Sequence, residues 1–264
     1  MSRQRSELSS RALVAVPAIA FALFIVIEGG LVFTIGLFAL GCVCMHELYA
    51  MYERAHPVRL AGFIALAGLL AGALYGNQFQ VLLAAVAALP LLFGLTISQR
   101  HPSVGGMALT LLGIYWIGFA LAYAVLLRDL PHGQGIVIDV LVGVFLGDTG
   151  AYLGGQMFGR RPLARRISPG KTVEGLLIGM VFAVLGVWIA GRYQTWLPGK
   201  HALVLGLGVA VAAPVGDLFE SFVKREARTK DSGRLFGAHG GALDRLDGVL
   251  FAAVLGYYIW AAYV

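Results

Sequence analysis

Acidic, basic and hydroxyl side chains are concentrated in residues 217–247 of an otherwise apolar sequence. Asp217, Glu220, Ser221 and Lys224 are spaced i, i+3, i+4 and i+7, so a helix would carry all four on one face. We expect this polar stripe to run toward the charged connection that follows the helix. A stripe of this kind is a candidate site rather than a packing surface.

A second pair of acids, Asp244 and Asp247, begins the next apolar run and can also share a helix face. Carboxylates that converge among several cations favour a divalent metal ion that holds a polyphosphate, because oxygen ligands suit Mg²⁺ while Lys and Arg neutralise phosphate charge. Interfacial salt bridges are the alternative for any single residue. His239 either packs in the loop or caps a helix, or it donates to a phosphate or nucleobase. Further candidate residues in the segment are Arg225, Lys230, Asp231, Ser232 and Arg245.

An earlier polar segment occupies residues 147–175. Asp148 and Tyr152, at i and i+4, share one helix face. The glycines around them would let another helix or a ligand approach the backbone closely. The stretch 168–172, which contains Lys171, resembles a phosphate-binding turn that leads into a helix, although its spacing is not that of a P-loop.

The elements that must position these residues are membrane helices. Of the 264 residues, 59% are hydrophobic and 13% are charged, which excludes an ordinary soluble fold. A helix needs roughly 20 mostly apolar residues to span a hydrocarbon core of about 30 Å. We therefore predict an all-α, polytopic integral membrane protein with about nine transmembrane helices. The apolar runs are 12–27, 31–45, 60–75, 80–98, 106–127, 135–158, 176–190, 202–223 and 248–264.

The basic residues predict the orientation, since Lys and Arg beside membrane helices collect on the cytoplasmic side. With these runs as spans, all 20 basic residues except Arg128, Arg192 and Lys200 fall on one side. We predict a protein of the cytoplasmic membrane whose amino terminus and active-site loops are cytoplasmic and whose carboxyl terminus lies on the opposite side. Because the basic residues border the membrane, anionic lipids are the expected partners and nucleic acid is not.

We predict a single membrane domain, 1–264, with two unlike halves. Residues 1–134 form a helical scaffold. Residues 135–264 form a catalytic half with cytoplasmic loops at 159–175 and 224–247.

Several acids and histidines outside the polar segments have simpler explanations. His46, Glu47, Glu53 and His56 are expected in a solvated cytoplasmic loop. Asp139 lies near the outer end of its helix, where it either reaches interfacial water or faces a cavity or partner.

The polar segments resemble the signature of the phosphatidate cytidylyltransferase family, the CDP-diacylglycerol synthases. The resemblance is carried by S-F-V-K-R at 221–225, K-D-S-G at 230–233, F-G-A-H-G-G at 236–241 and D-R-L-D at 244–247. It implies magnesium-dependent transfer of the cytidylyl group of CTP to phosphatidate, with CDP-diacylglycerol and pyrophosphate as products, for phospholipid biosynthesis. It also implies a homodimer, and it leaves room for a second metal ion, divalent or K⁺.

The resemblance assigns a role to each candidate residue. The principal metal ligands are Asp217 and Asp244, and Asp247 is a further metal ligand or a residue that supports the ligands. The catalytic residues are Asp217, Asp244, Lys224 and Asp231. The residues expected to hold the triphosphate are Lys224, Arg225, Lys230 and His239. The residues expected at a phosphate or lipid head group, or along the substrate cavity, are Lys171, Ser168, Arg165 or Arg166, Asp148, Tyr152 and Arg245. For Asp231, binding metal, orienting Lys230 and contacting nucleotide all remain open.

Two other functions fit the sequence. An ion-coupled membrane transporter would use Asp139, Asp148, Asp217 and Glu220 as an ion path, but the charged residues cluster at one interface rather than at mid-membrane. A CTP-dependent polyprenol kinase would transfer the γ-phosphoryl group and release CDP without pyrophosphate. A lipid-binding scaffold would have little use for so many acids and cations.

Overall fold

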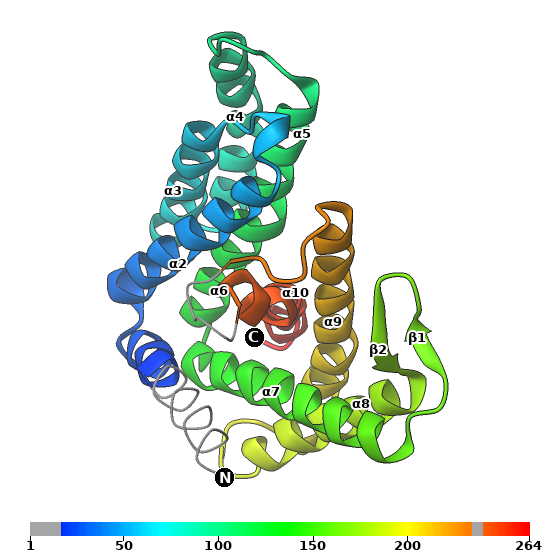
Figure 1. The fold of residues 1–264 in the computed structure, drawn as a ribbon. Helices are drawn as coiled ribbons and strands as arrows, with labels where there is room; N and C mark the ends of the chain where they lie inside the picture. Colours follow the sequence, from blue (N-terminus) through cyan, green and yellow to red (C-terminus); the bar gives the residue numbers. More distant parts are fainter. Residues whose placement is uncertain (1–16, 234–239) are drawn as a thin grey trace.

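The computed structural model describes residues 17–233 and 240–264, and these residues are mostly helical (Figure 1). They also contain a two-stranded antiparallel sheet, in which β1 (Pro162–Ala164) pairs with β2 (Ser168–Thr172). The helical segments are Pro17–Glu28, α2 (Gly30–Met51), the 3₁₀ turn η1 (Glu53–Ala55), α3 (Arg59–Tyr75), α4 (Gln78–Ile97), α5 (Val104–Gly113), the π-helical η2 (Ile114–Gly118), α6 (Phe119–Asp129), α7 (Gly133–Phe158), α8 (Val173–Gly191), α9 (Gly199–Glu226) and α10 (Leu243–Ala261).

The helices form two groups that meet at α10. Helices α2 to α5 lie together in one part of the molecule, and α7, α8, α9 and the β-hairpin lie together in the other (Figure 1). Helix α10 packs against α9, α6 and α7. One buried apolar cluster runs from Ile25 to Trp260 and takes residues from both groups. The two groups therefore share a core.

Within the described residues, six helical segments are long and apolar enough to cross a membrane. They are α2, α4, the continuous stretch Val104–Asp129, α7, α8 and α9. Over its described residues, each predicted apolar run coincides with a helical stretch, but the predicted count of nine is not confirmed. The described part of the first helix and α3 are shorter, and α10 starts with the charged residues Asp244, Arg245 and Asp247. The coarser prediction of a nearly all-α polytopic membrane protein is confirmed.

Large apolar side chains cover the outer faces of these helices. On α4, Phe79, Leu82, Leu83 and Phe93 are each more than half exposed. Apolar patches of this extent are rare on soluble monomers, and in a bilayer they would face lipid. The exposed apolar surface of these helices and their length therefore both indicate membrane spans.

The connection between α7 and α8 is a β-hairpin. The stretch that the sequence presents as a phosphate-binding turn is strand β2, and the helix that it leads into is α8. Thr172 ends the strand and caps the helix, because its hydroxyl accepts a hydrogen bond from the backbone N–H of Gly175 at 3.1 Å. Lys171 is therefore presented at the end of a strand, directly before a helix amino terminus.

The hairpin is tied to the helices on both sides of it. The Glu174 carboxylate on α8 accepts hydrogen bonds from the backbone N–H groups of Arg160 and Arg161 at 3.0 and 3.1 Å. The carbonyl oxygen of Ile167 accepts one from Nε of Arg225, on α9, at 3.0 Å. These contacts fix the hairpin over the ends of α8 and α9.

Asp139 is fully buried on α7. One of its carboxylate oxygens accepts a hydrogen bond from Nε2 of Gln194 at 2.9 Å. Of the two alternatives for this acid, contact with interfacial water is excluded by its burial, and a polar partner is confirmed. Its partner belongs to the connection between α8 and α9, so Asp139 joins α7 to that connection.

The contact between α7 and α8 generates a stability prediction. A Cβ atom at Gly179 would lie 2.7 Å from the Cβ of Ala151 and 2.7 Å from the backbone oxygen of Gly147. We expect Gly179→Ala to destabilise the protein by about 1–3 kcal/mol through overpacking, seen as a lower Tm in detergent. Gly68→Ala on α3 is the matched control, because a Cβ there meets no atom within 4 Å. Equal melting temperatures for the two variants would contradict a close α7–α8 contact.

Candidate active site

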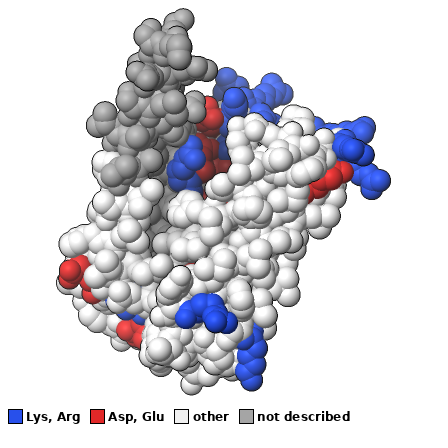
Figure 2. Space-filling view, turned by 90° about the horizontal axis from the view of Figure 1, so that it is seen from below, with Lys and Arg blue, Asp and Glu red and all other residues white. Residues whose placement is uncertain are grey.

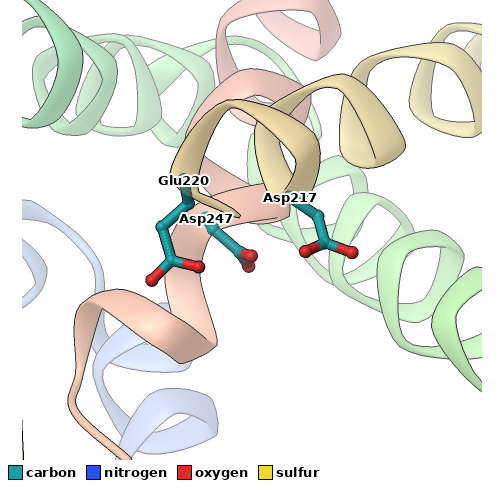
Figure 3. A group of neighbouring side chains, drawn as sticks. All are labelled: Asp217, Glu220 and Asp247. Carbon is teal, nitrogen blue, oxygen red and sulfur yellow. The ribbon is translucent and has the colours of Figure 1, made fainter. Parts of the chain in front are cut away.

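Three carboxylates meet where α9 packs against α10 (Figure 3). Asp217 and Glu220 lie one turn apart on α9, and Asp247 lies on α10. One oxygen of each lies within 4.8 Å of the other two. Gly216 makes this approach feasible, because a Cβ at that position would collide with the backbone carbonyl of Asp247. We call these three residues the carboxylate cluster.

The donor set of the carboxylate cluster fits a hard divalent cation. All three groups offer oxygen atoms, the ligands that Mg²⁺ and Ca²⁺ prefer. Glu220 is 1% exposed, and its Oε1 accepts no hydrogen bond within the described residues. Converging buried carboxylates repel one another unless cations neutralise them. Asp217, Glu220 and Asp247 could therefore hold a metal ion.

Lys224 connects the carboxylate cluster to Asp244. Its Nζ lies 2.5 Å from Oε2 of Glu220, one turn earlier on α9, and 2.6 Å from Oδ1 of Asp244 on α10. Asp244 also accepts hydrogen bonds from the backbone N–H of Ser232, at 3.0 and 3.2 Å, and of Gly241, at 2.7 Å. Asp244 thus organises the connection between the two helices.

The carboxylate cluster in the structure differs by one acid from the set of metal ligands predicted from the sequence. The sequence predicts Asp217, Asp244 and Asp247 as metal ligands, whereas the geometric cluster contains Glu220 in place of Asp244. The oxygens of Asp244 are engaged by Lys224 and by backbone donors. A ligand role for Asp244 stays a prediction.

A cavity opens beside the carboxylate cluster, and Lys171 lies at its wall. Lys171 forms an ion pair with Asp217, which joins the hairpin to α9. Asp148, on α7, is repelled by the like charge of Asp217 and attracted by the positive charges of Lys171 and Arg245. The cavity has a volume of about 490 Å³ and lies between α7, α8 and α9. Its lining includes Asp148, Tyr152, Lys171 and Asp217 together with the apolar side chains of Val144, Leu176 and Val209.

The remaining predicted residues lie around this centre. Ser168 is half-buried on β2, and Arg225 is committed to the carbonyl oxygen of Ile167 on the hairpin. His239 lies outside the described residues, so its contact with phosphate or nucleobase stays a prediction. The exposed residues among them are Arg165, Arg166, Arg225, Lys230, Asp231 and Arg245.

Glu47 is the residue that sequence reasoning misses. The prediction of a solvated loop for Glu47 is wrong, because α2 continues to Met51 and the side chain is only 6% exposed. Its carboxylate accepts hydrogen bonds from the hydroxyl of Ser232 and from the backbone N–H groups of Ala242 and Leu243, each at 3.0 Å. The signal in the sequence is an acid directly after an apolar run, which reads equally well as the start of a loop.

The charged residues gather at the ends of the molecule. On the face shown in Figure 2, Asp and Glu atoms lie in a hollow that Lys and Arg atoms border, and a largely uncharged surface separates them from the charges at the other end. A band without charge between two charged ends is the pattern of a membrane protein. On this face, the acidic hollow therefore lies at one of the two charged ends.

Comparison with known proteins finds similarity to cytidylyltransferases over nearly the whole chain. Residues 9–263 match the model of the cytidylyltransferase family. The phosphatidate cytidylyltransferase of Bacillus subtilis (strain 168) is 35% identical over 271 aligned residues, which cover 97% of this chain and 99% of that protein. The proteins of the same name from Brucella suis and Staphylococcus saprophyticus are 33% and 29% identical, over 98% and 93% of this chain and 95% and 96% of their own lengths.

The carboxylate cluster predicts which acids bind metal. We expect Glu220→Gln to weaken Mg²⁺ binding about tenfold or more, because it removes a charge from an oxygen donor set. Isothermal titration of purified protein with Mg²⁺ would measure it. Glu226→Gln is the matched control, since Glu226 ends the same helix and is exposed. Unchanged Mg²⁺ affinity in Glu220→Gln would remove Glu220 from the metal centre.

Proposed function

We propose that this chain, which belongs to the cytidylyltransferase family, transfers the cytidylyl group of CTP to phosphatidate and releases pyrophosphate. Family membership and relatives that align over nearly the whole chain support CTP-dependent synthesis of CDP-diacylglycerol, a step of phospholipid biosynthesis. The structural observation that carries the proposal is the carboxylate cluster, which lies with Lys224 and Lys171 beside a cavity between membrane helices.

The reaction asks the site to bring two anions together. A phosphate oxygen of phosphatidate forms a bond to the α-phosphorus of CTP while the bond from that phosphorus to the oxygen bridging to the β-phosphate breaks, and pyrophosphate leaves. Such a transfer depends on in-line positioning and charge neutralisation rather than on a covalent nucleophile. The lysines of this site are held among carboxylates by direct ion pairs, so they can neutralise charge from fixed positions.

We assign the metal centre to Asp217 and Asp247, with Glu220 from the geometry and Asp244 from the sequence as candidates for further coordination. A bound Mg²⁺ would neutralise phosphate charge and polarise the phosphoryl oxygens. The task of the chain is to hold the oxygen ligands within reach of one another, which the α9–α10 contact achieves. A second ion, divalent or K⁺, is part of the proposal, because the acids around the site outnumber the two lysines that pair with them.

The cations around the centre would hold the triphosphate and the lipid phosphate. Lys224 is oriented for this by its two ion pairs. Asp231 is proposed as a catalytic residue through one of its three open roles. The residues proposed for the triphosphate are Lys224, Arg225, Lys230 and His239, and those proposed for the lipid head group or the cavity wall are Lys171, Ser168, Arg165 or Arg166, Asp148, Tyr152 and Arg245.

The cavity suits a substrate that is charged at one end and apolar along the rest. Lys171, Asp148 and Asp217 supply the charged groups of its lining. Tyr152, Gln156 and Thr172 add polar groups, and most of the remainder consists of aliphatic side chains and glycines. Phosphatidate would place its phosphate near Lys171 while its acyl chains enter sideways from the lipid. Extracting the chains into water instead would cost about 0.8 kcal/mol per CH₂.

The finer topology and assembly belong to the same proposal. We propose about nine membrane spans in the cytoplasmic membrane, with the amino terminus and the loops at 159–175 and 224–247 cytoplasmic and the carboxyl terminus on the opposite side. The division into a scaffold, 1–134, and a catalytic half, 135–264, and the homodimer are proposed with it. The distribution of Lys and Arg supports the orientation.

Transfer of the α-phosphate label tests the function directly. We expect purified protein to move label from CTP labelled at the α-phosphate into phosphatidate, to release pyrophosphate and to require Mg²⁺. Asp217→Asn should lower the rate about 100-fold or more, since even residues behind metal ligands are worth about 10–100-fold. Lipid labelled only from γ-labelled CTP, with CDP released, would identify a polyprenol-kinase reaction instead. Substrate access from both sides without any transfer would support a transporter.

The cavity predicts a selective effect on the lipid substrate. We expect Leu176→Trp to raise the KM for phosphatidate about tenfold and to leave the KM for CTP unchanged. The larger side chain would fill part of the cavity, and lipid bound there would be overpacked at a cost of about 1–3 kcal/mol. Leu177→Trp is the matched control, since Leu177 is the next residue on α8 and is 57% exposed rather than part of the cavity wall. Steady-state kinetics in mixed micelles would measure both constants. Equal effects of the two substitutions would place the lipid elsewhere.

A further inference from the structure

Glu47 is a buried acid in the half of the chain that the sequence presents as scaffold. It lies on α2, and its carboxylate takes three hydrogen bonds from the segment between α9 and α10 and from the first turn of α10. Oε1 accepts from the N–H of Ala242, and Oε2 accepts from the N–H of Leu243 and the hydroxyl of Ser232. A carboxylate is favoured at a helix amino terminus, where N–H groups are unpaired and the helix dipole is positive.

The chain around Glu47 is shaped to admit the carboxylate. A Cβ atom at either Gly233 or Gly241 would collide with the Glu47 side chain. A buried carboxylate is strongly unfavourable without hydrogen-bond donors, so the three donors are held where Glu47 requires them. Glu47 therefore determines where Ser232 and the first turn of α10 lie.

The segment that Glu47 fixes also makes the contacts of Asp244. Ser232, which donates its hydroxyl to Glu47, donates its backbone N–H to Asp244 at 3.0 Å. Gly241, which packs against Glu47, donates its backbone N–H to the carboxylate of Asp244 at 2.7 Å. Asp247, which belongs to the carboxylate cluster, lies one turn after Asp244 on α10.

We propose that Glu47 is a positioning residue for the active site, which holds the start of α10 so that Asp244 and Asp247 face Lys224 and the acids of α9. The inference rests on the proposed function of the site, and it adds a residue of α2 to the machinery. Residues that orient metal ligands are typically worth about 10–100-fold in metal affinity or activity. A residue that served stability alone would change neither.

Glu47→Gln is the first test. The amide keeps the size of the side chain but replaces one acceptor oxygen with an NH₂ group, which would face N–H or O–H donors. We expect the Mg²⁺ concentration for half-maximal activity to rise about 10–100-fold. Binding of a non-hydrolysable CTP analogue in the presence of Mg²⁺, measured by titration calorimetry, should weaken in parallel. Glu53→Gln is the matched control, because Glu53 is exposed and pairs with Arg59. This control should match the wild type in both measurements.

Ser232→Ala provides an independent variant if Glu47→Gln does not fold. It removes one of the three hydrogen bonds and leaves the two backbone donors to Glu47 in place. We expect a smaller shift of Mg²⁺ dependence in the same direction. If Glu47→Gln does fold, the effects of the two substitutions should not add in the double variant, because the two residues act through one contact. Wild-type Mg²⁺ dependence and analogue binding in whichever variants fold would overturn the inference, whatever their Tm. Failure of the wild type itself to transfer the cytidylyl group would overturn the proposed function instead.

Discussion

Carboxylates buried between membrane helices need partners, because neither lipid nor an apolar core solvates their charge. This constraint is concentrated at the contact of α9 and α10, where Asp217, Glu220 and Asp247 converge. Lys224 offsets part of the charge from within α9, and Lys171 arrives from the hairpin to pair with Asp217. The remaining negative charge is what makes the centre suitable for a divalent cation and, through it, for polyphosphate. The same electrostatic demand that would destabilise a purely structural core becomes useful where a charged substrate binds.

Small residues let the helices around this centre come close enough to form the site. Gly216 brings α9 against the backbone of α10 at Asp247, and Gly179 brings α8 against α7. Side chains on these faces would separate the helices and move the wall of the cavity. The result is an apolar cavity next to a charged centre, with Lys171 and Asp217 lining it. This combination matches a reaction between a nucleotide that arrives from water and a lipid that stays in the bilayer.

The two halves of the chain are joined at the site itself. Glu47 on α2 holds the first turn of α10, and the hydroxyl of Tyr52 donates to the carbonyl oxygen of Val223 on α9 at 2.7 Å. Both contacts connect residues more than 150 positions apart in the chain. The first half therefore supports the geometry of the charged centre as well as anchoring the protein. The exact boundary between scaffold and catalytic half stays a prediction.

The sequence alone determined the membrane class, the approximate position of each helix, the acidic stripe on α9 and the resemblance to the cytidylyltransferases, because these depend on local composition and spacing. Tertiary structure decided which side chains contact one another. That Glu220 rather than Asp244 completes the carboxylate cluster, that Lys171 pairs with Asp217, and that Glu47 is buried against α10 all depend on which helix faces meet. Periodicity places a residue on a face of its own helix, but it carries no information about the helix opposite. The contacts that assemble this site join distant segments, so only the packed chain could show them.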